Sequence, residues 1–86
     1  MITYQGGSGL ETKDAIIIKG AKDELEGIEG EYIWLEEKFG EQDVMWELVD
    51  QEFIDAGDIK YDILKIKFPN GEVKEIWFDI TDFYGR

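Results

Sequence analysis

The sequence predicts an α+β fold in which one helix packs on an antiparallel β-meander, in the order β-α-β-β-β, as a two-layer sandwich. Three patterns carry this prediction. Apolar residues recur at helical spacing within 21–39, two alternating segments flank Pro69-Asn70-Gly71, and a short β-branched run precedes the helix. A chain of 86 residues is expected to form one domain, 1–86.

The N-terminal residues 1–14 are poor in strong helix or strand formers and include a Gly-Gly-Ser-Gly run. We expect them to form a glycine-containing arm or loop, with the α+β core in residues 15–86. Residues 15–18 (Ala-Ile-Ile-Ile) predict a short buried strand, because β-branched side chains favour a packed, pleated surface. Gly20 is expected to end this strand.

Residues 21–39 predict the helix. Its expected core-facing stripe follows spacings of 3, 4, 3 and 4 and consists of Leu25, Ile28, Tyr32, Leu35 and Phe39. Gly40 stands where a helix commonly ends with a positive φ. The pattern contains two interior glycines, Gly27 and Gly30, each of which disfavours a helix by about 1 kcal/mol relative to alanine.

The next segment, Val44 to Phe53, alternates apolar and polar residues and predicts a strand. The apolar parity changes at Val49, which predicts either a β-bulge or an early end of the strand there. Residues 55–58 (Asp-Ala-Gly-Asp) predict a turn.

Residues 59–68 and 72–81 predict a β-hairpin with a three-residue loop at 69–71, in which Gly71 takes a positive φ. In this register Lys65 lies opposite Glu75 on one face. The other face carries the apolar side chains Leu64, Ile66, Phe68, Ile76, Phe78 and Ile80. The aromatic tail, 81–86, is expected to pack back onto the sheet.

Composition excludes several kinds of chemistry. The chain has no cysteine and no histidine, so it lacks thiolate nucleophiles, disulfides, sulfur-bound zinc and the usual general base. Its net charge of −12 opposes direct nucleic-acid binding. No segment resembles a membrane span or a signal peptide, and a cytoplasmic protein is expected.

We expect neither an enzyme nor a cofactor or metal site. The single serine, Ser8, has no histidine to activate it, and its glycine loop precedes a strand, unlike a phosphate-binding loop. The acids at Asp55 and Asp58 do not continue into a calcium-binding loop. Carboxylates are abundant, so a catalytic carboxylate pair remains an alternative.

The helix carries seven acidic residues against two lysines. This pattern is typical of a solvated helix face, but it can also steer a protein onto a basic partner. Trp34 lies about 180° around the helix from Leu25, where a polar residue is expected. Two interpretations stay open: the N-terminal arm covers Trp34, with partial cover expected, or Trp34 anchors a partner. The hypothetical partner-binding set is Trp34, Asp23, Glu26, Glu37 and Gly30.

The sequence also resembles a group of small uncharacterised bacterial proteins. The resemblance rests on residues 15–18 with Gly20-Ala21, on Glu31-Tyr32 with Trp34-Leu35 and Phe39-Gly40, and on 78–85. It extends over most of the chain from Gly6. No activity is established for that group, so the resemblance implies a bacterial or phage origin and no functional residue.

These patterns together favour a non-enzymatic acidic interaction domain: a small inhibitor, an immunity-type protein or a phage anti-defence protein. Its expected partner is a basic protein surface, such as the nucleic-acid-binding face of an enzyme. The alternative is an accessory or structural domain that self-associates through a sheet edge, with its charge serving only solubility.

Overall fold

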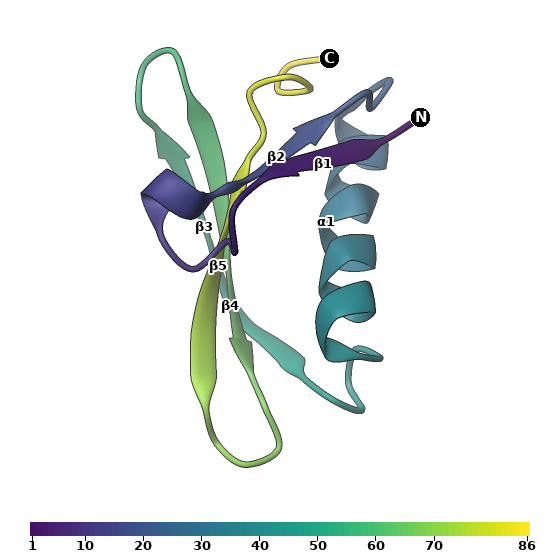
Figure 1. Ribbon diagram of the computed structural model, residues 1–86, viewed down its shortest axis with the longest axis vertical. Helices are drawn as coiled ribbons and strands as arrows, with labels where there is room; N and C mark the ends of the chain where they lie inside the picture. The colour runs from purple at the N-terminus through teal and green to yellow at the C-terminus, as the bar shows by residue number, and fades with distance from the viewer.

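The computed structural model describes all residues 1–86. It consists of a five-stranded mixed β-sheet with one α-helix on one of its faces (Figure 1). The elements are β1 (Thr3–Gly6), a 3-10 turn η1 (Thr12–Asp14), β2 (Ile16–Lys19), α1 (Glu24–Phe39), β3 (Glu47–Asp55), β4 (Lys60–Lys67) and β5 (Val73–Asp79). The strand order is β1-β2-β5-β4-β3. The predicted α+β class with a single helix is confirmed.

The sheet is not the simple meander that the sequence predicted. Strands β3, β4 and β5 form an antiparallel meander, but β2 pairs with β5 in parallel. The chain reverses direction at each connection from β2 through α1, β3 and β4 to β5. After these four reversals β5 runs in the same direction as β2, so the two strands pair in parallel. The helix carries the chain across the sheet to β3, at the far edge, and the meander leads back (Figure 1).

The N-terminal segment differs from the expected arm. Thr3–Gly6 form β1, which pairs antiparallel with β2 and completes one edge of the sheet. Ile2 and Tyr4 lie on the same side of this strand and pack against the hydrophobic core. Only residues 7–14 form the expected loop, with η1 within it. The period-two placement of Ile2 and Tyr4 was the signal for a strand.

The helix begins at Glu24, three residues after the expected start, and ends at Phe39 before Gly40, whose φ of 101° is positive as expected. Its core-facing side differs from the predicted stripe by about 90° around the axis. Leu25 and Ile28 are 67% and 39% exposed. Leu35 of the predicted stripe is buried, and Tyr32 and Phe39 pack against the core. The side facing the sheet also carries Gly27, Gly30, Glu31 and Trp34.

Two side chains from other elements explain this rotation. A Cβ atom added at Gly27 would lie 2.5 Å from the ring of Phe83, so the glycine makes room for that ring. A Cβ atom at Gly30 would lie 3.0 Å from Ile2. The helical glycines therefore mark the face against which the C-terminal tail and the N-terminal segment pack.

The hairpin between β4 and β5 has the predicted register. Lys65 pairs with Glu75, and the amide of Phe68 donates to the carbonyl of Glu72 at 2.8 Å. Gly71 has a φ of 89°, as a three-residue loop requires. The predicted apolar face is buried except at Phe68, which is half-buried.

Strand β3 is the second edge of the sheet, and most of its side chains are exposed. The predicted irregularity at Val49 is confirmed, since the register with β4 shifts between Leu48 and Asp50. The strand begins at Glu47 instead of Val44, because Trp46 is buried in the preceding turn, where its indole N–H donates to the carbonyl of Gly40 at 2.8 Å.

The C-terminal tail packs back onto the rest of the fold, as expected. Phe83 is buried under α1, and Tyr84 stacks on Phe53 of β3 with ring centroids 5.2 Å apart. The amide of Gly85 donates to Glu24 at 2.8 Å. The tail therefore joins the start of α1 to the edge strand β3.

Candidate functional site

The residues expected to bind a partner lie at two separate places on α1. Trp34 and Glu37, together with Lys38, line a hollow of about 180 Å³. Trp34 is half-buried, and its ring makes edge-to-face contacts with Phe39 and Phe78 at centroid distances of 6.1 and 5.8 Å. Trp34 is therefore partly covered, with Phe39 and Phe78 against its ring, and its cover by the N-terminal segment stays a prediction.

The other three predicted residues already form hydrogen bonds within the chain. Asp23 is the N-cap and accepts from the amide of Glu26 at 2.9 Å, while Glu26 accepts from the amide of Lys22 at 3.1 Å. Gly30 is buried, and its carbonyl accepts from the Tyr4 hydroxyl at 2.7 Å. Asp23 lies about 16 Å along the helix from Trp34, so the five residues form no single patch.

A pair of buried acids that the sequence analysis did not single out lies between the helix and the sheet. Glu31 of α1 is 1% exposed and Asp62 of β4 is 6% exposed. Their side chains are hydrogen-bonded to one another. Glu31 Oε2 is buried, and no N–H or hydroxyl group of the chain donates a hydrogen bond to it. A buried oxygen without such a donor is rare, and it marks this pair as a candidate site.

Burial determines the protonation of the pair. Desolvation, followed by the hydrogen bond and the negative charge of Asp62, raises the pKa of Glu31 to about 10. Desolvation also raises the pKa of Asp62, although the hydrogen bond from Glu31 opposes that increase. Tyr32 beside the pair has a raised pKa through its own burial and the two acids. At neutral pH Glu31 is therefore the protonated partner and donates to Asp62.

Asp62 opens onto a groove between α1 and β3. The groove measures about 170 Å³ and is lined by Glu24, Ile28, Gln51, Phe53, Asp62, Ile80, Phe83 and Tyr84. Ile80 and Phe83 are buried, whereas Ile28, Phe53 and Tyr84 are exposed. The groove thus combines apolar walls with an acid. Its residues come from α1, β3, β4 and the segment that follows β5.

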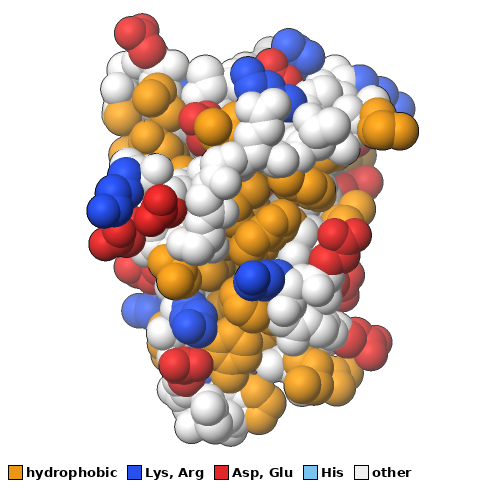
Figure 2. Space-filling model, in the orientation of Figure 1, with side chains coloured by type: hydrophobic (Ala, Val, Ile, Leu, Met, Phe, Trp, Pro, Cys, Tyr) orange, Lys and Arg blue, Asp and Glu red, His pale blue; other side chains and the backbone are white.

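Few of the acidic side chains are neutralised within the chain. Only three ion pairs are present, Lys13–Glu11, Lys60–Asp55 and Arg86–Asp82, against 21 acidic residues. Figure 2 shows apolar side chains between the helix and the sheet on the β1 side, with acidic side chains along the helix. The surface of α1 therefore presents unpaired negative charge.

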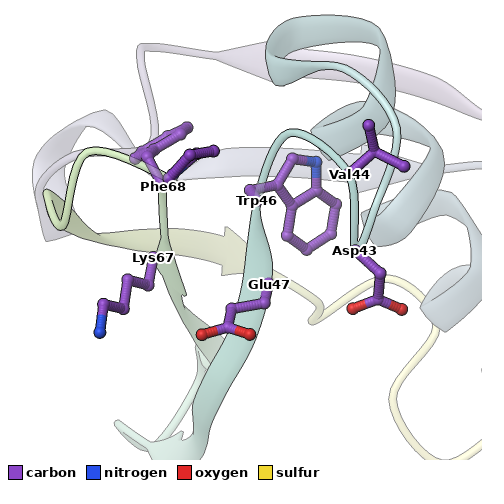
Figure 3. A pocket seen from close by; sticks show the side chains of 7 residues that line it. Asp43, Val44, Trp46, Glu47, Lys67 and Phe68 are labelled. Carbon is purple, nitrogen blue, oxygen red and sulfur yellow. The ribbon is translucent and has the colours of Figure 1, made fainter.

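The largest cavity, about 240 Å³, lies elsewhere, between the turn before β3 and the end of the β4–β5 hairpin. Figure 3 shows Trp46 and Phe68 beside it, with Glu47 and Lys67 on the adjoining strands. The indole N–H of Trp46 is already bonded to Gly40, so the cavity contains no buried donor that awaits a ligand. This cavity is a weaker candidate than the groove.

No group of three or more Asp, Glu, His or Cys side chains is arranged to hold a metal ion. Neither α1 nor η1 has the length and apolar composition needed to cross a bilayer. The chain matches no protein-family model, and comparisons with curated proteins and with solved structures find no match either. Its function is therefore inferred from the groove and the surface.

Proposed function

We propose that this protein is a non-enzymatic acidic domain that binds a basic surface of another protein. The outward side of α1 carries this proposal. Leu25, Ile28 and Ile33 are 67%, 39% and 49% exposed, and the acids Glu29 and Glu36 are exposed between them. A solvated helix is expected to be polar on this side, whereas protein interfaces combine an apolar centre with a polar rim.

The charge of the domain supports a basic partner. A net charge of −12, with three ion pairs, leaves an attractive field for a positively charged surface. Such a field mainly accelerates association, and its effect falls as salt is added. A small inhibitor, an immunity-type protein or a phage anti-defence protein acting in the cytoplasm fits this description.

The catalytic alternative is less well supported by the geometry of the acid pair. Glycosidases hold their two carboxyl groups about 5–9.5 Å apart, on either side of the bond that they cleave. Glu31 and Asp62 are hydrogen-bonded to each other and leave no room for a substrate bond between them.

Self-association through β3 is also less well supported. The edge strand carries Glu47, Asp50, Glu52 and Asp55, all exposed. Two copies paired along this edge would bring like charges together, and charged side chains on edge strands commonly prevent such pairing.

The proposal is tested by capture of proteins from a bacterial lysate on the immobilised domain at about 0.15 M salt, with elution at high salt. We expect basic proteins to elute. The variant Glu29→Gln/Glu36→Gln should capture less than Asp58→Asn/Glu72→Gln, which removes the same charge from two turns. Equal capture by both variants, or recovery of only further copies of this chain, would contradict the proposal.

A further inference from the structure

The groove between α1 and β3 has the size of a site for one side chain. Its volume of about 170 Å³ lies below the roughly 300–1,000 Å³ of typical small-molecule pockets. Buried Phe83 and Ile80 form its floor, and exposed Ile28, Phe53 and Tyr84 form its rim. An extended side chain with an apolar stem would fill this space.

The polar end of the groove favours a cation with several donors. Asp62 faces the groove as an acceptor, whereas its partner Glu31 is 1% exposed and does not line the groove. Glu24, also on the groove, accepts a hydrogen bond from the amide of Gly85. Lys60, the nearest lysine along β4, is bonded to Asp55 and to the carbonyl of Gly57, so no cation of the chain itself pairs with Asp62.

The aromatic rim distinguishes between the two cationic side chains. The rings of Phe53 and Tyr84 are stacked, with 15° between their planes. A planar guanidinium stacks on aromatic faces and donates two parallel hydrogen bonds to a carboxylate, whereas an ammonium is a strongly hydrated point charge. The rim and the carboxyl pair together fit a guanidinium better.

We propose that the α1–β3 groove receives an arginine side chain of the basic partner, with its guanidinium on Asp62 and stacked on the ring of Phe53, and its methylenes against Phe83. This inference rests on the proposed function and names the side chain that the partner inserts. Before binding, only Asp62 of the pair is charged. The guanidinium lowers the cost of a second negative charge on the pair, so Glu31 releases its proton when the groove is filled. Asp62 and Tyr32 face this proton, and the charge of Glu24 acts on Asp62.

The test uses an acetylated, amidated peptide of alternating glycine and arginine, titrated into the ¹⁵N-labelled protein, with the lysine peptide as comparison. We expect amide shifts centred on Phe53, Asp62 and Tyr84, and weaker binding of the lysine peptide. Asp62→Asn should weaken arginine-peptide binding about tenfold or more, whereas Asp58→Asn, which removes the same charge from a turn, should leave it nearly unchanged. Phe53→Ala, an exposed substitution, provides a second variant should Asp62→Asn fold poorly.

Calorimetry in two buffers of different ionisation enthalpy then counts the protons released near pH 8. Release of up to one proton by the arginine peptide, lost in Glu31→Gln, is the expected result. Salt-sensitive binding that shifts only the outer side of α1, equal for Asp62→Asn and Asp58→Asn, would overturn the groove and leave the proposed function standing. The absence of any salt-sensitive binding would overturn both.

Discussion

The carboxyl group of Glu31 on α1 donates a hydrogen bond to Asp62 on β4, and both residues are buried. Because the two acids belong to opposite layers, the packing of the helix on the sheet creates the pair. Burial keeps one proton on it at neutral pH. This relationship links the stability of the fold to pH and gives the groove its polar end.

Stability is expected to fall as the pH rises. The folded pKa of Glu31, about 10, is far above its ordinary value of 4.5, so between these values the folded state binds more protons than the unfolded state. The free energy of unfolding therefore decreases with pH in this window, by up to about 1.4 kcal/mol per pH unit. Urea unfolding between about pH 5.5 and pH 7.5 measures this slope.

Glu31→Gln separates this effect from general charge repulsion. Glutamine keeps a donor for Asp62 and does not titrate, so the variant should show a shallower pH slope than the native chain. Glu29→Gln, an exposed neighbour on the same helix, is the matched control and should keep the native slope. Parallel slopes for the native chain and Glu31→Gln would mean that Glu31 is ionised in the fold.

Gly27→Ala should destabilise the protein, although alanine is the better helix former. The new Cβ atom would lie 2.5 Å from the ring of Phe83, and overpacking of this kind destabilises a fold by about 1–3 kcal/mol. Glu29→Ala, at an exposed helical position, should change stability by no more than about 0.5 kcal/mol. A gain in stability for Gly27→Ala would contradict the close contact with Phe83.

The hairpin register predicts unequal effects at adjacent positions. Ile66→Ala removes a fully buried side chain and should destabilise the fold by about 2–5 kcal/mol. Lys67→Ala, on the exposed face, should stay within about 0.5 kcal/mol. Thermal or urea unfolding compares the two, and similar losses would show that the register is wrong.

Trp34 should stabilise the fold through its packing, whether or not it also contacts a partner. Its ring contacts Phe39 and Phe78, so Trp34→Ala should destabilise the protein by about 3 kcal/mol, less than Trp46→Ala, which removes a fully buried indole. Chemical unfolding of the two variants provides the comparison. An unchanged midpoint for Trp34→Ala would instead indicate an exposed anchor.

Sequence patterns predicted the elements that depend on local spacing. The β4–β5 hairpin, its loop at 69–71, the bulge near Val49 and the end of α1 at Gly40 follow from alternation and glycine placement, which act over a few residues. The parallel pairing of β2 with β5 could not be read in the same way, because it joins residues about sixty positions apart.

The helix face and the acid pair were missed for a related reason. Helical periodicity identified the apolar stripe at Leu25 and Ile28, but the helix packs on the side where Gly27 receives Phe83, a contact made by a distant residue. Alternate residues of a strand share one face, so the position of Asp62 two residues before Leu64 and four before Ile66 indicated that its side chain faces the core. Without the helix orientation, nothing indicated that Glu31 was its partner.

The most direct test of the account is the titration of the Glu31 side-chain carboxyl by ¹³C NMR, with Glu29 as an exposed reference in the same spectra. We expect Glu31 to stay protonated through neutral pH and to titrate near pH 10. A Glu31 resonance that titrates near its ordinary value of 4.5 would contradict the buried, proton-sharing pair.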